Sequence, residues 1–523
     1  MYGGDHSDFL NAGPGADHLY GGNGADSLDC GAHADFLDPD YSSGCMIGWR
    51  AWTKPLIRRM NLSPNTSRRH LAKFQPAMSH DTPILPGLSP VDGLDIHARF
   101  DGGSMSSNGG ALLLREVELR MGLADLLASC LVDRRDPGRV QHSYASMIRA
   151  RMIAIACGDE DCDDLDALRH DPALKMACER VPDAALGLAS QPTLSRLENL
   201  PGWRALARMG IRMIDAFCDS FSRPPAQIVL DIDDTTDLVH GGQQLALFNT
   251  PADGLCFQPI HIYEAATAKP VACILRPGKR PSGEEAARVL RHVIRRIQAN
   301  WPRVAITLRG DGHYGTPEVM ETLEAMGCRY ILGLPGNARL KEIAHPWCED
   351  AATRRALSGK DRVRRFFETP YAAKSWSRER RVIARIEASR MGADARFVVT
   401  NLAGRSKHLY EKLYCARGRM ENMIKEHKLY TRSDRTSCHR WEANQFRLML
   451  HTAAYWLLHS LRGAAPKRSR WRTATFETIR VAFLKIAVRV EQLKTRIRLS
   501  LPSACPQAAM IALMLRRIHA QGP

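Results

Sequence analysis

The stretch from residue 227 to residue 334 restricts the possible folds most strongly. Its segments rich in β-branched residues alternate apolar and polar positions, which is typical of strands, and two capped helical segments separate the later ones. The order is β-β-β-α-β-α-β, with strands expected at 227–233, 256–265, 271–278, 304–308 and 329–334, and helices expected after the caps Ser282 and Thr316. This order predicts an α/β fold with an antiparallel meander followed by two helix-linked strands.

Three acidic residues follow this pattern. Asp233 lies near the end of the first expected strand, and Asp311 follows the fourth, between glycines in RGDGHYG. Glu421 lies on a later expected helix. In the ribonuclease-H-like fold, the active acids emerge from these same elements, so we predict a catalytic core of that class. Asp231 shares the strand face of Asp233 and is the alternative; Asp233 is preferred because it is nearer the strand end.

The segment 414–428 is expected to form the helix that carries the third acid. At about 100° per residue, Tyr414, Arg417, Glu421 and Lys428 fall within a stripe about 60° wide, and Lys425 joins the same face. One carboxylate among an aromatic and three cations suits a metal ligand placed beside a polyanion. A solvated helix with ordinary charge pairs is the competing interpretation.

Three converging carboxylates predict a two-metal centre. Such a centre holds two Mg²⁺ ions about 4 Å apart, lowers the pKa of an attacking water and stabilises the leaving oxygen of a phosphodiester. Carboxylates favour Mg²⁺, for which Mn²⁺ can substitute, whereas His or Cys ligands would favour zinc. The fourteen cysteines are scattered without a CxxC pair, so spacing gives no zinc motif, and reduced thiols in a cytosol are expected.

The charge of the chain indicates a polyanionic partner. A net charge of +17 favours nucleic acid, with an acidic membrane surface as the lesser alternative. No apolar run reaches the length of about 18 residues that a membrane span needs, and the first thirty residues lack an apolar signal core. We therefore expect nucleic acid as the partner and no membrane association. The family resemblance described below further implies double-stranded DNA and a location in the bacterial cytoplasm at the nucleoid.

The first forty residues differ from the rest. Residues 3–38 repeat with a period of nine, place aspartate at every sixth position and resemble the RTX calcium-binding nonapeptide repeat, which implies possible Ca²⁺ binding. An acidic glycine-rich tail is the alternative. Residues 41–78 reverse the charge, with seven Lys/Arg and no acid. We interpret 1–77 as a foreign segment fused to a gene whose own start lies near Met78.

The sequence also predicts the domain layout of the chain. Residues 336–413 carry strand-like pieces and are read as a β-rich insertion, while Lys485–Arg498 is expected to be an amphipathic helix. The expected layout is 1–40 repeats, 41–87 basic flexible linker, 88–222 mainly α DNA-binding domain, 223–463 catalytic domain with that insertion, and 464–523 basic helical region.

Several motifs resemble a known family. The spacing Tyr-x2-Arg-x3-Glu-x6-Lys resembles that of DDE transposases in the group named after insertion sequence four. LDIDDTTDLVHGGQQ, ILRPGKRPSGEE, LRGDGHYG and YAAKSWSRERR resemble the "thirteen-eighty" family of insertion-sequence transposases, from about Leu88 to the C-terminus. The resemblance implies that Asp233, Asp311 and Glu421 are the catalytic metal ligands.

The same resemblance implies DNA contacts and an activity. Tyr414, Arg417 and Lys428 would contact phosphates near the cleaved end, with Lys425 on the same face. The expected function is cut-and-paste transposition, in which a homodimer holds two terminal inverted repeats. The alternatives are a structure-specific nuclease of the same fold, a catalytically silent DNA-binding repressor, and an extracellular Ca²⁺-binding repeat protein.

Overall fold

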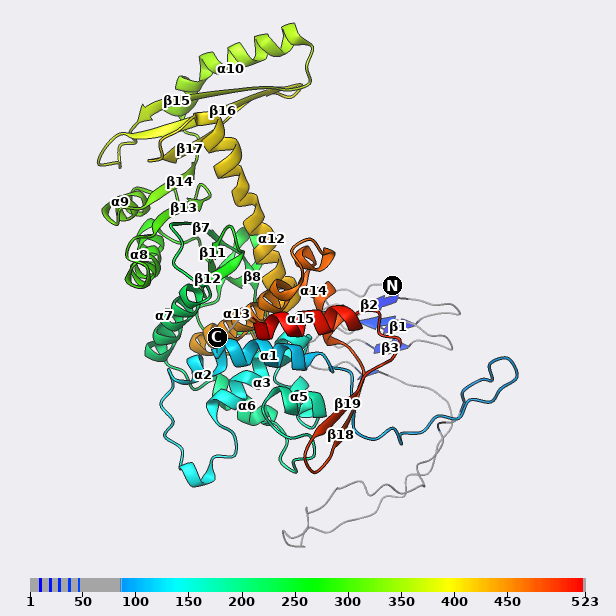
Figure 1. Ribbon diagram of the computed structural model, residues 1–523. Helices are drawn as coiled ribbons and strands as arrows, with labels where there is room; N and C mark the ends of the chain where they lie inside the picture. Colours follow the sequence, from blue (N-terminus) through cyan, green and yellow to red (C-terminus); the bar gives the residue numbers. More distant parts are fainter. Residues whose placement is uncertain are drawn as a thin grey trace. The chain divides into compact units, whose positions relative to one another are not determined.

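The computed structural model describes residue 85, residues 87–520 and five short strands between residues 9 and 47. The strands expected at 227–334 are neighbours in an eight-stranded sheet and extend inward from one of its edges (Figure 1). In spatial order these five are β12 (Lys269–Ile274), β11 (Ile260–Glu264), β7 (Gln227–Asp234), β13 (Ala305–Gly310) and β14 (Arg329–Leu334). β11 is antiparallel to both neighbours, whereas β13 is parallel to β7 and to β14. The α/β class is therefore confirmed.

One expected strand is divided in two. The segment expected at 256–265 breaks before Ile260, so that β10 (Gly254–Phe257) leaves the large sheet. β10 pairs instead with β8 (Asp237–Leu238) and β9 (Leu247–Asn249) in a small sheet. This small sheet follows directly after the end of β7, where Asp233 lies.

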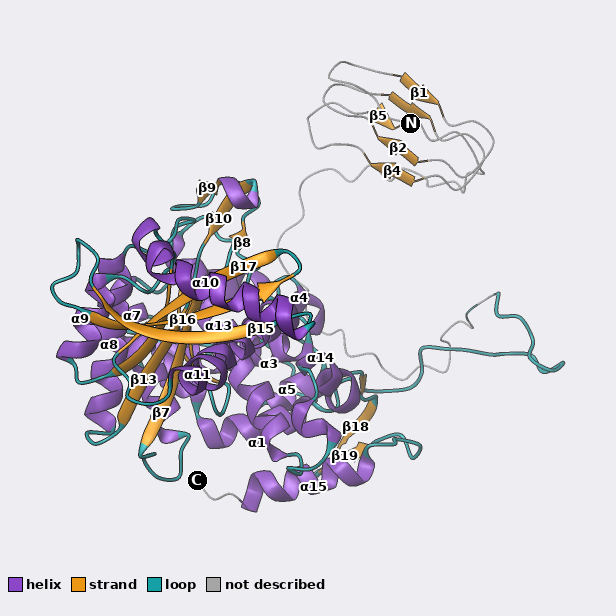
Figure 2. Cartoon of the chain, turned by 90° about the horizontal axis from the view of Figure 1, so that it is seen from above, coloured by secondary structure: helices purple, strands orange, loops and turns teal. Residues whose placement is uncertain are grey.

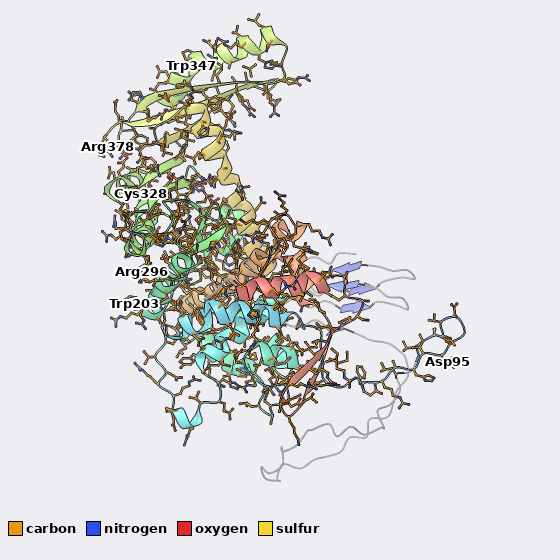
Figure 3. The ribbon with its side chains drawn as sticks, in the orientation of Figure 1. Asp95, Trp203, Arg296, Cys328, Trp347 and Arg378 are labelled. Atoms are coloured by element: carbon orange, nitrogen blue, oxygen red, sulfur yellow. The ribbon has the colours of Figure 1, made fainter. Side chains whose placement is uncertain are left out.

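The β-rich insertion expected at 336–413 extends the large sheet. Beyond β14 lie β17 (Gly392–Thr400), β16 (Arg380–Ser389) and β15 (Val363–Tyr371), all antiparallel. The insertion also contains a helix that the sequence pattern did not reveal, α10 (Ala338–Ser358), which packs on these three strands (Figure 2). Trp347 of α10 stacks on Phe367 with ring centroids 5.1 Å apart (Figure 3). The helix was missed because it contains Pro346 and presents no regular apolar stripe.

Alternate residues of the strands serve the two faces of the sheet. Tyr330 and Leu332 of β14 belong to the main core, which includes apolar residues of α8 (Gly283–Asn300) and α9 (Pro317–Ala325). Ile331 belongs to a second cluster together with Leu409. The helical segment that carries Glu421 therefore covers the face opposite to α8 and α9 (Figure 1).

The expected helix caps are present, with one difference. Ser282 and Glu285 form a reciprocal capping box at the start of α8, as predicted. Thr316 occupies the N-cap position of α9, but its side chain makes no capping hydrogen bond. Arg296 of α8 pairs with Asp215 at 2.6 Å, which joins α8 to α7 (Trp203–Asp219) (Figure 3).

Residues 88–222 are mainly helical, as expected. Their elements are β6 (Met105–Ser106), α1 (Ala111–Met121), α2 (Leu123–Ala128), α3 (Tyr144–Cys157), α4 (Asp164–Leu168), α5 (Pro172–Ala177), α6 (Gln191–Glu198) and α7 (Trp203–Asp219). They share a core with α13 (Trp441–Ala464), the apolar helix near the C-terminus. A buried ion network joins the two, because Glu198 accepts from Arg151 at 3.0 Å and from Arg447 at 3.1 Å. Residues 80–523 form one compact unit, and the domain boundaries expected within it stay predictions.

The expectation of an amphipathic helix at Lys485–Arg498 was wrong. This stretch forms a hairpin of β18 (Val488–Gln492) and β19 (Ile497–Ser500), and β18 also pairs with β6. Val488 and Val490 are buried while Arg489 between them is exposed, an alternation with the period of a strand. The single turn α14 (Phe476–Ile479) lies before this hairpin, and helix α15 (Ala508–Ala520) follows it.

The N-terminal unit, residues 1–79, contains five short strands, which are β1 (Phe9–Asn11), β2 (His18–Tyr20), β3 (Ser27–Asp29), β4 (Phe36–Asp38) and β5 (Met46–Ile47). The first four strands recur every nine residues, and alternate ones pair in parallel. Almost all of the expected linker, 41–87, lies outside the described residues. Among the described helices, none is both long and apolar enough to cross a membrane.

Candidate active site

The segment 406–430 is continuously helical but irregular. It begins as α11 (Ser406–His408), widens into a π-helical turn at η3 (Leu409–Tyr414), tightens to 3₁₀ at η4 (Cys415–Gly418), becomes α12 (Arg419–Lys425) and widens again at η5 (Glu426–Tyr430). A uniform 100° per residue does not hold across these turns, so the regular stripe expected at 414–428 was wrong in detail. The functional residues of this segment must therefore be placed by their contacts.

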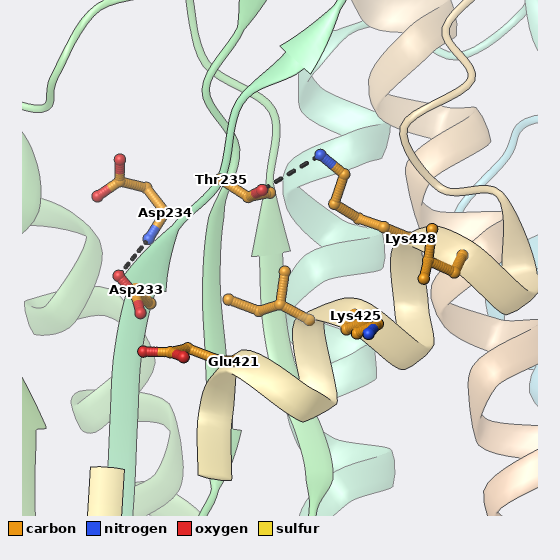
Figure 4. A pocket seen from close by; sticks show the side chains of 8 residues that line it. Asp233, Asp234, Thr235, Glu421, Lys425 and Lys428 are labelled. Atoms are coloured by element: carbon orange, nitrogen blue, oxygen red, sulfur yellow. Dashed lines mark hydrogen bonds between the residues drawn. The ribbon is translucent and has the colours of Figure 1, made fainter. Parts of the chain in front are cut away.

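Two of the three predicted acids line one cavity. Asp233 from the end of β7 and Glu421 from α12 both face a cavity of about 330 Å³ (Figure 4). Its remaining walls are Asp234, Thr235, Ile424, Lys425, Lys428 and Leu429. Glu421 and Lys425 are exposed, whereas Asp233 and Lys428 are half-buried. The cavity thus combines carboxylates and ammonium groups, as the sequence predicted for this helix face.

Asp233 lies between a cation and a second acid. One of its oxygens, Oδ2, accepts a hydrogen bond from Nη1 of Arg417 at 2.7 Å. Burial raises the pKa of Asp233 to about 6, Arg417 opposes this effect, and the nearby charge of Asp311 adds to it. This carboxylate is held in a poorly solvated position where its ionised form needs a cation, which Arg417 supplies in this structure.

Asp311 follows β13, in the loop that the sequence placed there. Its Oδ1 accepts the backbone N–H of His313 at 2.9 Å. The loop is pressed against Gly333 of β14, where an added Cβ would lie 2.6 Å from the nitrogen of Gly312 and 2.8 Å from the hydroxyl oxygen of Tyr414. Gly333 therefore allows both Tyr414 and the Asp311 loop to approach the sheet, a role that sequence reasoning missed.

Asp231, the alternative to Asp233, takes part in a buried ion pair. Its side chain is 0% exposed and receives two 2.6 Å hydrogen bonds from Arg309. Arg309 also donates to the backbone carbonyl of Leu413 at 2.7 Å. The pair thus ties β7 and β13 to the turn that precedes Tyr414. A signal existed for it, because Arg309 and Asp231 are direct register partners on neighbouring strands.

Asp237 follows Asp233 by four residues and is buried. It lies in β8 with its side chain 1% exposed, and its Oδ1 is 3.0 Å from Nζ of Lys428. Lys428 also donates to the carbonyl oxygen of Thr236 at 2.6 Å and to the hydroxyl of Thr235 at 3.3 Å (Figure 4). The ammonium of Lys428 therefore anchors η5 to the chain segment that leaves β7. Burial raises the pKa of Asp237 to about 7, although Lys428 lowers it.

The donors at this site suit a hard divalent cation. Asp233, Asp311 and Glu421 offer only carboxylate oxygens, and the Arg417 contact shows that Asp233 already requires a positive partner. The three acids are not gathered into a tight cluster, because the described residues contain a single group of three or more potential ligands within 4.8 Å of one another, and it lies elsewhere. The chemical type of these ligands thus suits a divalent metal. Asp233 and Glu421 line one cavity, and Asp311 lies close to Asp233.

Known proteins resemble the chain in two separate regions. A model of the RTX calcium-binding nonapeptide repeat, in four copies, matches residues 2–37. No curated protein matches significantly. Among solved structures, the piggyBac transposase synaptic complex with hairpin DNA is 11% identical over 72% of this chain and 80% of that chain, with a TM-score of 0.38.

Two further solved structures are similar at a lower level. The Mos1 transposase paired-end complex with left transposon end is 16% identical over 43% of this chain and 69% of that chain, with a TM-score of 0.16. The Drosophila P element transposase strand transfer complex is 11% identical over 60% and 69% of the two chains, with a TM-score of 0.19. The family model described as "Transposase DDE domain group 1" matches residues 88–523. Because that match spans most of its length, the chain belongs to the DDE-domain transposases of group 1.

Proposed function

We propose that this transposase cuts double-stranded DNA at the ends of its element and joins the freed 3′-hydroxyl to target DNA, at a ribonuclease-H-like centre that requires Mg²⁺. The observation that carries the proposal is the shared cavity of Asp233 and Glu421, which come from β7 and α12 and lie far apart in sequence. Asp311 lies near enough to raise the pKa of Asp233. The sheet order β12-β11-β7-β13-β14 supports the same fold class.

Asp233, Asp311 and Glu421 would hold the metal, for which Mn²⁺ can substitute. When bound, Mg²⁺ would supply a water of lowered pKa and a charge that stabilises the leaving oxygen. Arg417 keeps the Asp233 carboxylate oriented toward the helix that carries Glu421. The Arg309–Asp231 pair and Gly333 fix the positions from which Asp311 and Tyr414 reach the site.

The cations on the helical segment are proposed to contact DNA phosphates. Lys425 lines the cavity and is exposed, so its ammonium is directly available to a phosphate. Tyr414, Arg417 and Lys428 are proposed as further contacts, and in the absence of DNA Arg417 and Lys428 are paired with acids of the protein. The net charge of +17 supports binding to a polyanion.

Three further features concern assembly, location and the N-terminal repeats. Joining two element ends requires that both be held at once, so a homodimer is the proposed active form. A location at the bacterial nucleoid is proposed, because the proposed partner is DNA. The nonapeptide repeats at residues 2–37 are proposed to bind Ca²⁺.

The test is cleavage of a labelled duplex that carries the element's terminal inverted repeat, by the full chain in Mg²⁺ and in EDTA. We expect nicking in Mg²⁺ or Mn²⁺ and none in EDTA. Glu421→Gln keeps the side-chain shape but removes the anion, so nicking should fall by orders of magnitude while end binding persists. Glu411→Gln is the matched control, because Glu411 lies on the same helical segment but outside the cavity and should leave nicking unchanged.

The outcomes separate the alternatives. Nicking without joining to a target plasmid would indicate a nuclease, and binding without nicking would indicate a silent repressor. Wild-type nicking by Glu421→Gln would remove Glu421 from the site. Lys425→Ala should lower the slope of log affinity against log salt by about one, and an unchanged slope would place this face away from DNA.

A further inference from the structure

A second cluster of potential metal ligands lies on the strands next to β7, the strand that carries Asp233. It consists of His261 from β11, Cys273 from β12 and His427 from η5, and one ligand atom from each lies within 4.8 Å of the others. All three side chains are buried. The three residues come from separate elements and are brought together by the fold alone. They play no part in the proposed DNA cleavage.

The spacing of the cluster agrees with tetrahedral zinc. Bond lengths of about 2.3 Å to sulfur and about 2.05 Å to nitrogen place the two donor atoms about 3.6 Å apart at a tetrahedral angle. The Sγ of Cys273 lies 3.3 Å from Nδ1 and 3.7 Å from Nε2 of His261. One thiolate and two imidazoles are a donor set for zinc rather than for Mg²⁺.

The buried surroundings keep both histidines neutral, which is the form that binds a metal. Burial lowers the pKa of His427 to about 3 and the pKa of His261 well below its usual value, so both rings are neutral at pH 7. The hydroxyl of Tyr263 lies 3.2 Å from Nδ1 of His427. The hydroxyl of Thr452 lies 3.4 Å from Nε2 but donates its proton to the carbonyl oxygen of Leu448 at 2.7 Å, so it does not occupy the lone pair of that nitrogen. With Tyr263 on Nδ1, Nε2 is the nitrogen that would face the metal, as is usual for ligating histidines.

The thiol of Cys273 would lose its proton on binding. Burial raises the pKa of this thiol well above its usual value, so in the metal-free protein it stays protonated. Zinc would replace that proton, which leaves to solvent, and the ion with one thiolate would carry a net charge of +1. The Asp237–Lys428 ion pair lies close by, with the carboxylate acting on the sulfur of Cys273 and the ammonium acting on His261.

We propose that His261, Cys273 and His427 bind one Zn²⁺ ion that cross-links β11, β12 and η5. The position of the cluster gives the ion a structural task. His261 is the register partner of Asp233, and His427 follows Glu421 on the same continuous helical segment. The ion thus fastens the element that carries Glu421 to the strands beside Asp233. Three protein donors leave one tetrahedral position for a further ligand.

The test measures metal binding by the full chain and does not depend on activity. Protein freed of metal is titrated with Co²⁺ and then with Zn²⁺, while sulfur-to-cobalt charge-transfer absorption and bound zinc are recorded. Cys273→Ser removes the thiolate with little change of volume. Cys256→Ser is the matched control, because Cys256 is also buried, on strand β10 of the small sheet, and lies outside the cluster.

We expect wild type and Cys256→Ser to bind one Co²⁺ with the charge-transfer band and to exchange it for zinc. Cys273→Ser should lose the band and bind zinc at least tenfold more weakly. Equal zinc affinity in the two serine variants would overturn the proposal. If Cys273→Ser does not fold, the wild-type cobalt spectrum decides, because a spectrum without sulfur-to-cobalt absorption excludes the site.

Discussion

Replacing Lys428 by methionine tests whether this lysine anchors the helical segment from inside the protein. Methionine keeps an unbranched stem of similar length but removes the ammonium that lies 3.0 Å from Asp237. The carboxylate of Asp237 is 1% exposed and would lose its ion-pair partner. Removing one partner of a buried ion pair costs about 3–5 kcal/mol. Because Lys428 is 20% exposed, we expect the lower end, about 3 kcal/mol at pH 8.

The destabilisation caused by Lys428→Met should be smaller at lower pH. The pKa of Asp237 is about 7 in the folded protein and, for an unfolded chain, about 3.9. Between these values the folded state binds more protons, so the free energy of unfolding falls as pH rises toward 7 and is flat above it. Lowering the pH from 8 to 6 protonates Asp237 and raises the free energy of unfolding of wild type by about 1.4 kcal/mol. In a variant whose Asp237 pKa lies well above 8, the same change of pH raises it by about 2.7 kcal/mol. The destabilisation should therefore be about 1.3 kcal/mol smaller at pH 6.

The assay is urea unfolding of the full chain, followed by tryptophan fluorescence at pH 8 and pH 6. Adding Asp237→Asn to Lys428→Met should restore most of the lost stability, because the unpaired charge is then removed. Lys425→Met is the matched control, an exposed lysine of the same cavity, and should stay within about 0.5 kcal/mol of wild type at both pH values. Equal destabilisation at the two pH values, or no gain from Asp237→Asn, would refute the buried ion pair.

Three further predictions concern stability and the N-terminal unit. Glu198→Ala leaves two buried arginines without their shared partner and should cost about 3–5 kcal/mol in urea unfolding; a cost below about 1 kcal/mol would contradict the network. Gly110→Ala adds a methyl 1.8 Å from the carbonyl oxygen of Phe483 and should sharply lower soluble yield and Tm. Gly418→Ala, whose methyl meets no atom within 4 Å, should be neutral. Equal Tm values for the two variants would contradict the close approach at Gly110. Deleting residues 1–79, which lie outside the family match, should leave cleavage equal or improved, since their acidic repeats repel DNA; a tenfold loss would show that they contribute to the reaction.

The central sheet could be predicted from sequence because its signals are local. Alternating β-branched segments located β7, β13 and β14 within one or two residues, and the capping box located the start of α8. The strand ends then indicated Asp233 and Asp311, since a side chain at a sheet edge opens to solvent. The Arg309–Asp231 pair follows from the strand register, but only after β13 is known to lie beside β7.

The parts that sequence did not reveal depend on contacts between distant segments. The π-helical turns around 414–428 have no residue signature, so the helix face drawn at uniform pitch was only approximate. The stretch 485–498 has mixed periodicity, and its pairing with β6 made it a hairpin. The cluster of His261, Cys273 and His427 has no spacing motif, because its members come from three elements.

The pairing of β6 with β18 has a consequence for the order in which the chain folds during synthesis. β6, near the start of the helical region, pairs with β18, which is made much later. Beside this pair, the backbone N–H of Gly109 donates to the carbonyl of Ile486 at 2.8 Å. The strands of the large sheet all lie between residues 227 and 400, and they can assemble as soon as that part leaves the ribosome. The helices before them cannot bury their shared apolar face until α13 and β18 have been made. The helices α1 to α7 are thus translated before the large sheet but complete their folding after it.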